Sequence, residues 1–385
     1  NLRYLKKADM LQLYQTKELP TVKEIRRLSM AKGKKIILMK DASIKKLSDS
    51  PDIQRALLAG EFIIDFTTII FPHETISALK KLETLRQFSS MRPQSCHSET
   101  LCDSLFSKMP NLESLLINVS SSKILSSSFK AFPRLKILQI KIKLWTIQLG
   151  QRLQLNMEYP PGIERLDIEV RKNDTVSYQI EPGIEYFNRL RELHNLKAFK
   201  IAVEDPECLL MTSFVHNLPI QLQELRLLME SRSENSKLLG DIAERLPNLK
   251  ALSLFRFTCQ DILTFKEDAF AGLNELVLSD TYIPGSLMVK IARSCKTIKF
   301  YRCERCLHEL GIVENISSIL NSICSLPHVQ ELKIEIETIN SDEESVILQH
   351  LLKMCYAKQS LRKFKLSLSE YTPEKTVVDD FYNLV

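Results

Sequence analysis

The sequence predicts an α/β solenoid, with a curved, mainly parallel β-sheet on its concave face and helices on its convex face. Two observations carry this prediction. A short apolar pattern recurs over most of the chain, and a proline precedes several of its copies at one fixed distance. Each copy would supply one strand, and stacking of consecutive copies would bury the apolar side chains of each copy against its neighbours.

Residues 1–60 are predicted to form a basic N-terminal segment or cap. The first 50 residues hold 13 of the chain's 53 Lys and Arg but only 5 of its 47 Asp and Glu. Nucleic-acid or nucleoprotein binding through this segment is therefore one alternative function. A solvated helix face and loop would carry the same charges without any partner. A strand is predicted over 33–41, where the sequence reads GKKIILMKD.

Residues 61–104 are interpreted as a degenerate repeat or a linker. The run GEFIIDFTTI at 60–69 predicts a strand, and ETISALKKLETL at 74–85 predicts a helix. A solenoid needs capped ends because its terminal coils would otherwise expose a core face. At the other end of the chain, we expect residues 371–385 to form a C-terminal tail or cap.

Residues 105–370 are predicted to form the solenoid, from a repeated unit that reads apolar-x-x-apolar-x-apolar. Its ten copies are Leu112/Leu115/Ile117, Leu135/Leu138/Ile140, Ile163/Leu166/Ile168, Leu196/Phe199/Ile201, Leu222/Leu225/Leu227, Leu249/Leu252/Leu254, Leu273/Leu276/Leu278, Cys295/Ile298/Phe300, Val329/Leu332/Ile334 and Leu361/Phe364/Leu366. Five copies have a proline two residues before the first apolar position: Pro110, Pro133, Pro161, Pro247 and Pro327. Proline cannot continue a helix and favours an extended conformation in the residue before it, so each coil should run from helix through turn to strand. Apolar residues at three- and four-residue steps predict helices over 235–247, 312–327 and 344–358.

The segment LNELVLSDTYIPGSLMVKIARSCKTIKFYRC at 273–303 resembles the cysteine-containing repeat of F-box/leucine-rich-repeat proteins. More generally, the pattern over about 105–370 resembles the leucine-rich-repeat family. That family usually has Asn or Cys three residues after the third apolar position, and here only Cys303 conforms. Several units instead continue to alternate, as in LKILQIKIKL and VQELKIEIETI, which predicts longer strands with looser turns.

Several classes of chemistry lack their sequence signature. The chain has only 9 glycines, and no phosphate-binding or dinucleotide-binding glycine motif occurs in it. Its nine cysteines have no disulfide-framework spacing, so we expect reduced thiols in a cytoplasmic or nuclear protein. CERCLH at 303–308 lacks the second ligand pair of a structural zinc site. No apolar run reaches membrane-spanning length. We therefore predict a non-catalytic protein without cofactor, metal or membrane partner.

The candidate binding residues come from the middle of the solenoid. Residues between and just after the inward-pointing apolar positions should face the concave side. There the sequence places an apolar group among mixed charges, with Phe255 as its aromatic centre. The predicted partner-binding residues are Arg226, Leu228, Phe255, Val277, Lys299 and Tyr301. Alternatively, a flanking loop or tail of the same chain covers Phe255, because apolar patches on soluble proteins serve either partners or intramolecular cover.

The resemblance implies recognition of a protein partner through the concave face. A substrate-receptor or adaptor role of the F-box type fits the resembling repeat. Besides nucleic-acid binding, a second alternative is an effector or inhibitor that wraps a target enzyme. The sequence indicates neither the identity of the partner nor an oligomeric state.

Overall fold

The computed structural model describes strands β1 to β4 and, with short gaps, residues 107–119, 129–144, 158–172, 189–203, 215–229, 236–259, 266–302, 312–337 and 349–369. The chain divides into two compact units, Asn1–Leu196 and Lys197–Val385. We describe each unit by itself. The predicted helix over 74–85, the CERCLH segment and residues 371–385 lie outside the described residues.

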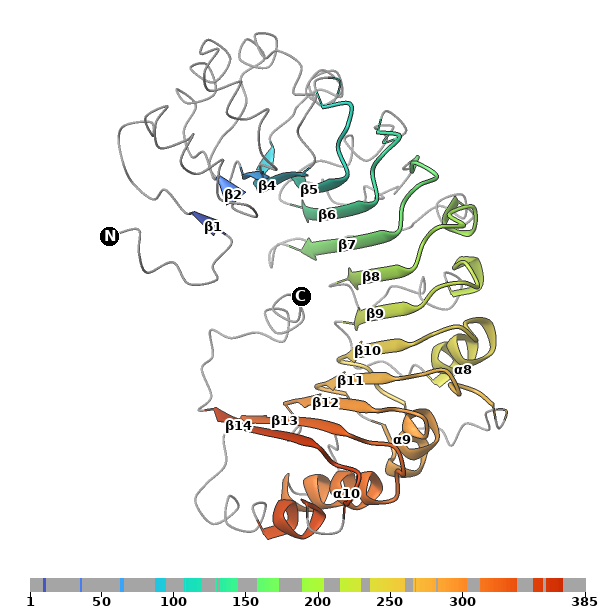
Figure 1. Ribbon diagram of the computed structural model, residues 1–385, viewed down its shortest axis with the longest axis vertical. Coiled ribbons are helices and arrows are strands. Elements are labelled where there is room, and N and C mark those ends of the chain that lie inside the picture. The colour runs from blue at the N-terminus through green and yellow to red at the C-terminus, as the bar shows by residue number, and fades with distance from the viewer. Residues whose placement is uncertain are drawn as a thin grey trace. The chain divides into compact units, whose positions relative to one another are not determined.

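In the first unit, each strand pairs in parallel with the next one along the chain (Figure 1). The strands are β1 (Met10–Leu11), β2 (Lys35–Ile36), β3 (Ile63–Asp65), β4 (Gln87–Gln94), β5 (Ser114–Val119), β6 (Ile137–Leu144) and β7 (Arg165–Lys172). Strands β2 and β3 lie inside the strand segments predicted at 33–41 and 60–69, whereas β1 and β4 were not predicted.

The second unit repeats this arrangement and adds helices. Its strands are β8 (Ala198–Val203), β9 (Glu224–Met229), β10 (Ala251–Phe255), β11 (Glu275–Ser279), β12 (Thr297–Tyr301), β13 (Glu331–Glu337) and β14 (Lys363–Ser369). All neighbours in this order pair in parallel. Its helices are η4 (Val215–Asn217), α8 (Ser236–Arg245), α9 (Gly285–Ala292) and α10 (Ile312–Cys324), and residues 349–355 are also helical. Helices α8, α9 and α10 lie on one side of this sheet (Figure 1).

The sequence predictions for helices and strand length are largely confirmed. Helices α8 and α10 fall within the predicted segments 235–247 and 312–327, and the helical residues 349–355 fall within 344–358. The units with continued alternation do have longer strands: β6 and β7 have 8 residues and β13 and β14 have 7, against 5 in β10 to β12. The four predicted segment boundaries stay a prediction.

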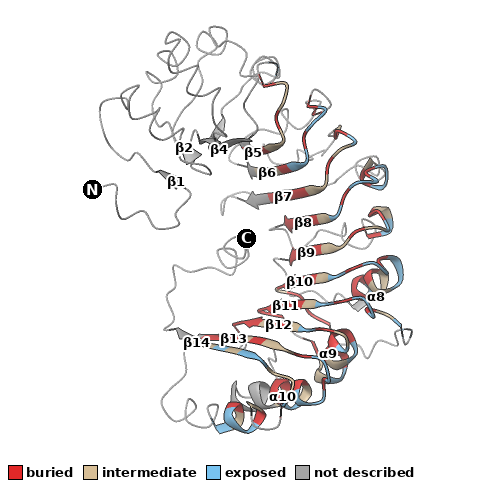
Figure 2. Cartoon of the chain, viewed as in Figure 1, coloured by how far each residue is buried: buried red, intermediate tan, exposed pale blue. Residues whose placement is uncertain are grey.

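The predicted apolar positions form the core (Figure 2). In the first nine copies all three side chains are at most 5% exposed. In the last copy, Leu361, Phe364 and Leu366 are half-buried. The first apolar position of a copy lies in the turn rather than in the strand: Leu249 precedes β10 by two residues. The structure therefore confirms an α/β solenoid of the leucine-rich-repeat type in which each copy is one coil.

Each coil enters its strand through the same hydrogen-bond pattern. The backbone carbonyl of Gln223 accepts from the N–H groups of both Lys250 and Ala251, at 2.7 and 2.9 Å. The Lys250 carbonyl accepts in the same way from Asn274 and Glu275 in the next coil, at 2.8 and 3.0 Å. Six further coil entries among the described residues show the same pattern, with the acceptor carbonyls on Glu113, Lys136, Lys197, Asn274, Lys296 and Gln330. This repeated pattern holds neighbouring strands in one constant register.

Side chains complete the turns at positions that differ from the family pattern. The Asn248 side-chain amide donates to the Ile220 carbonyl of the preceding coil at 3.1 Å, one residue before an apolar unit begins. Thr281 stands where the family has Asn or Cys. Its buried hydroxyl shares its one proton between the carbonyl oxygens of Leu254 and Ser279, at 2.9 and 2.8 Å. In this coil a Thr hydroxyl therefore takes the hydrogen-bonding role that Asn or Cys has at this turn position in the family pattern.

A residue with a left-handed backbone conformation comes directly after each of the strands β10 to β12. Arg256, Asp280 and Arg302 directly follow these strands and have φ of 51°, 49° and 54°. A non-glycine residue rarely adopts this conformation. The Arg256 and Asp280 backbone N–H groups donate to the carbonyls of Ser279 and Tyr301 at 2.9 and 3.2 Å. These hydrogen bonds continue the pairing of neighbouring coils beyond the strands and hold the chain in the turn.

The core assignment predicts the effect of truncating Leu252. Leu252 is fully buried, so Leu252→Ala should lower the free energy of unfolding by about 2–5 kcal/mol through lost burial and the cavity left behind. Leu352 is 59% exposed, and Leu352→Ala is the matched control with little expected effect. Chemical denaturation of both variants measures the difference, and equal losses would contradict the assignment.

Two neighbouring hydroxyls should respond in opposite directions. The Ser279 hydroxyl is buried without a hydrogen-bond partner, whereas Thr281 makes the two bonds described above. Thr281→Val leaves buried carbonyls with fewer donors and should cost about 1–3 kcal/mol of unfolding free energy. Ser279→Ala removes an unsatisfied buried group and should leave stability equal or higher. A loss in the Ser279 variant as large as in the Thr281 variant would refute this difference.

Candidate functional site

The six predicted binding residues lie on one face of the second unit's sheet, opposite the core side chains. Strand β9 carries Arg226 and Leu228, β10 ends with Phe255, β11 carries Val277, and β12 carries Lys299 and Tyr301. Side chains alternate between the two faces of a strand, so these residues point away from their apolar neighbours in the repeat. Their placement on consecutive strands agrees with the sequence prediction.

The register separates the six residues into two rows. Phe255 pairs with Leu228 on one side and with Ser279 on the other, and Ser279 pairs with Tyr301. Val277 belongs to the preceding row, where it pairs with Lys299. The row that contains Phe255 stands at the ends of the strands, and the row that contains Arg226, Val277 and Lys299 stands two residues earlier.

The predicted exposure of the apolar members is wrong. Leu228 and Phe255 are 1% exposed, Tyr301 is 4% exposed and Val277 is 5% exposed. Together with Ala202 they form one buried hydrophobic cluster. Strands about 5 Å apart bring these bulky side chains into contact along the rows, and the protein's own chain takes up the surface that the sequence left for a partner. Phe255 is therefore buried within its own chain, and its cover by a flanking loop or tail stays a prediction.

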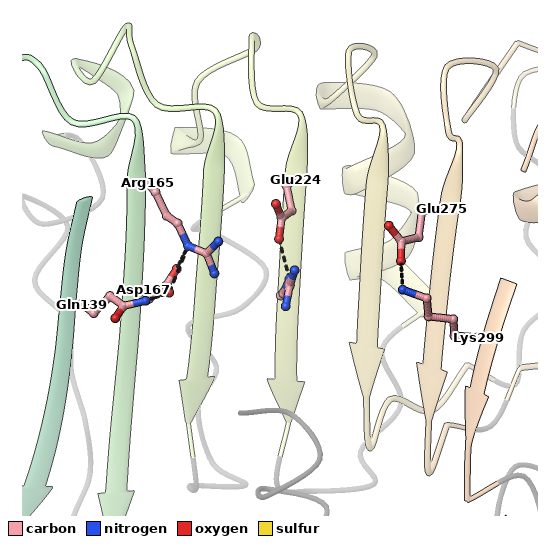
Figure 3. Close-up of polar contacts among 7 residues, drawn as sticks. Gln139, Arg165, Asp167, Glu224, Glu275 and Lys299 are labelled. Atoms are coloured by element: carbon pink, nitrogen blue, oxygen red, sulfur yellow. Dashed lines mark hydrogen bonds and ion pairs between the residues drawn. The ribbon is translucent and has the colours of Figure 1, made fainter. Parts of the chain in front are cut away.

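The charged members remain partly exposed and are paired within the sheet (Figure 3). The Arg226 guanidinium Nε lies 2.5 Å from a carboxylate oxygen of Glu224 on the same strand. Lys299 Nζ lies 2.5 Å from a carboxylate oxygen of Glu275 on the neighbouring strand. The side chains of these four residues are 19–36% exposed. Sequence reasoning identified both cations but missed their carboxylate partners, which stand in the row before them.

Charge pairs continue along the same face to the last described strand. Lys333 Nζ lies 3.5 Å from a carboxylate oxygen of Glu335, and Lys363 Nζ lies 3.3 Å from one of Glu331. The Lys333 ammonium also lies 4.1 Å from the centroid of the Tyr301 ring, a cation–π contact. We call the paired residues Glu224, Arg226, Glu275, Lys299, Glu331, Lys333, Glu335 and Lys363 the polar strand face.

The first unit has a similar arrangement on β6 and β7. Arg165 Nε lies 3.1 Å from Asp167, and the Gln139 side-chain amide donates to the same carboxylate at 2.8 Å (Figure 3). Lys141 Nζ lies 3.4 Å from a carboxylate oxygen of Glu169. Both carboxylate side chains here are only 5–11% exposed. These pairs are as enclosed as Lys333–Glu335 and more enclosed than the other pairs of the polar strand face.

Other features of the described residues do not form a site of comparable extent. No group of three or more His, Cys, Asp and Glu side chains in the described part of the chain is arranged to hold a metal ion. A shallow groove of about 590 Å³ between α9 and α10 is lined by small side chains such as Ser286, Ser318 and Ser322. Burial raises the pKa of the Cys295 thiol to about 12, with a further contribution from the charge of Glu275, so this thiol stays protonated at neutral pH. No described helix is both long enough and apolar enough to cross a membrane.

The alternative of nucleic-acid binding concerns residues that the structure describes only in part. Of the first 50 residues, the described ones are those of β1 and β2. The nucleic-acid alternative therefore stays a prediction, as does the assignment of Cys303 to the turn position of the repeat.

Truncation of Phe255 distinguishes a buried cluster from an exposed patch. Because Phe255 is 1% exposed, Phe255→Ala should lower the free energy of unfolding by about 3–5 kcal/mol. Phe255→Leu keeps most of the apolar volume and should cost clearly less. Thermal and chemical denaturation of the two variants provide the measurement. An unchanged stability of Phe255→Ala would restore the exposed-patch interpretation.

Comparisons with known proteins do not identify a family. No protein-family model matches the chain, and no curated protein sequence matches it. Among solved structures, 61 chains match. One belongs to the crystal structure of the mouse RP105/MD-1 complex, with a TM-score of 0.41, 12% sequence identity, and coverage of 95% of this chain and 67% of that chain. A likeness of this size carries no argument, so the candidate site stands on the geometry of this chain.

Proposed function

We propose that the protein is a non-catalytic binding module that recognises a protein partner through the polar strand face. The observation that carries the proposal is a set of ion pairs on one face of the second unit's sheet. Glu224–Arg226, Glu275–Lys299 and Lys363–Glu331 are partly exposed, and the Lys333–Glu335 pair beside them has a buried carboxylate. An extended face built from several strands fits a macromolecule better than a small molecule, which usually binds in an enclosed pocket.

The energetics of these pairs support a role in recognition rather than in folding. Ion pairs that remain in contact with water contribute only about 0–1 kcal/mol to stability. A partner can therefore exchange its own charged groups for those of the sheet at little cost to the fold. Alternating carboxylates and cations would also reject partners with a mismatched charge pattern.

The buried cluster next to this face gives it a rigid support. Tyr301 belongs to that cluster, and Lys333 packs on its ring, so at least one cation of the polar strand face is held by a buried aromatic side chain. Preorganised side chains lose less conformational entropy on binding, which favours affinity.

A substrate-receptor or adaptor role of the F-box type is the finer form of this proposal, and it rests on the sequence resemblance of residues 273–303 alone. The same face would also serve an effector or inhibitor that wraps an enzyme. Identification of the bound protein separates these roles.

Site-specific photo-crosslinking tests the proposal. A photoreactive amino acid at position 299 of the full chain, expressed in its own cells, should give discrete protein adducts that mass spectrometry identifies. The same probe at Lys353, which is exposed on the helical residues 349–355, is the matched control and should give none of these adducts. Identical adducts from both positions would contradict the proposal.

Charge-reversal variants of this protein then test whether the identified partner recognises the charges of the polar strand face. Lys299→Glu should weaken partner binding by about tenfold or more, equivalent to about 1.4 kcal/mol. The double variant Glu275→Lys/Lys299→Glu restores an ion pair of opposite polarity. If the partner recognises the individual charges, the affinity of the double variant for the partner stays low, as isothermal titration calorimetry would show. Full recovery of affinity would show that the pair acts only within the fold.

A further inference from the structure

Two cysteines lie at the ends of consecutive helical segments near the end of the second unit. Cys324 is the last residue of α10 and is exposed. Cys355 ends the described helical residues 349–355 and is half-buried. Both are free thiols, and neither contributes to the polar strand face.

The repeat places these cysteines in neighbouring coils. Strands β13 and β14 pair in parallel with Glu331 opposite Lys363. Cys324 stands seven residues before Glu331, and Cys355 stands eight residues before Lys363. The two thiols thus occupy corresponding places in consecutive coils, within one residue. Corresponding residues of consecutive coils are neighbours in a solenoid.

Lys358 makes hydrogen bonds to the ends of both helical segments. Its Nζ lies 3.5 Å from the backbone carbonyl oxygen of Cys324, to which it donates. Its backbone N–H donates to the carbonyl of Met354, next to Cys355, at 2.9 Å. One lysine therefore contacts the end of α10 with its side chain and the end of the next helical segment with its backbone.

The electrostatics of these groups agree with this proximity. Burial raises the pKa of the Cys355 thiol above its usual range, and negative charge on Cys324 raises it further. Burial lowers the pKa of the Lys358 ammonium, while negative charge on Cys324 acts in the opposite direction. Both influences agree with the hydrogen bond from Lys358 to the Cys324 carbonyl, which places the three residues in one neighbourhood.

We propose that Cys324 and Cys355 are a redox-sensitive pair that hydrogen peroxide converts into a disulfide between the last two described coils. Cys324 is the exposed thiol and reacts first. Its thiolate sulfur attacks one peroxide oxygen, the O–O bond breaks, and the departing hydroxide takes up a proton to leave as water. Cys324 is then a sulfenic acid.

The second step closes the disulfide. The Cys355 sulfur attacks the Cys324 sulfur and loses its proton, the S–O bond breaks, and hydroxide leaves with that proton as a second water. Two thiols are oxidised, and one peroxide is reduced to two waters. A disulfide requires Cα atoms within about 7 Å, so the coil ends must approach to that distance for the bond to form.

The bond would act on the coil that is least well packed. Leu361, Phe364 and Leu366 of the last copy are half-buried, while the corresponding residues of the preceding copies are buried. A covalent link between residues 324 and 355 restricts the unfolded chain and holds the last coil on its neighbour. This inference does not depend on the proposed function, since the thiols lie outside the polar strand face.

Mass spectrometry of the peroxide-treated protein tests the proposal. The full chain is exposed to hydrogen peroxide, free thiols are alkylated, and trypsin separates the two cysteines by cleavage after Lys333 and Lys353. We expect a peptide pair linked through Cys324 and Cys355, with the mass of two hydrogens lost, that disappears on reduction. Cys295 is buried and serves as the internal control that should stay reduced.

Single variants test the order of the two steps. In Cys355→Ser, Cys324 has no partner thiol and should accumulate as a sulfenic acid that dimedone traps. In Cys324→Ser, Cys355 should give much less of this adduct. The proposal is overturned if peroxide leaves both thiols reduced, or if Cys324 links only to other cysteines or to a second chain. The wild-type linked peptide decides this even if a serine variant folds poorly.

Discussion

The structure depends on the hydrogen bonds with which each coil enters its strand. One backbone carbonyl accepts two N–H groups from the next coil, as Gln223 does from Lys250 and Ala251. The acceptor stands just before the strand, so the register is set before the strand begins. A slip by one residue would turn every side chain to the opposite face. The alignment of Leu225, Leu252 and Leu276 across three strands follows from this constraint.

The same alignment creates the charged rows. Because the register is constant, a carboxylate in one row meets a cation in the next, either along one strand, as with Glu224 and Arg226, or across two, as with Glu275 and Lys299. These pairs keep contact with water and contribute little to stability. Their regular order follows from the constant register of the strands and not from a need for stability.

The face opposite the helices changes character along the strands. Near the strand starts it is polar and partly exposed, whereas at the ends of β10 to β12 it is buried. At these ends both faces of the sheet are packed, as in other parallel sheets. The left-handed residues Arg256 and Asp280 then turn the chain, and they form an ion pair with 3.7 Å between Arg256 Nε and a carboxylate oxygen. The partly exposed charged residues of β9 to β12 are therefore confined to the first part of each strand.

The sequence by itself determined that each repeat forms one turn followed by one strand. An apolar spacing of three residues and then two matches neither a helix nor a strictly alternating strand, but it suits a chain that turns and then extends. The positions of Leu252 and its equivalents, the proline turns and the helices at 236–245 and 312–324 could all be predicted from the sequence. Only the tertiary structure decided that the Phe255 side chain is buried. Alternation along a strand fixes the face to which a side chain points, but not whether that face is covered. The tertiary structure also decided the partners of Arg226 and Lys299, and the role of Thr281, since these contacts depend on how neighbouring coils align.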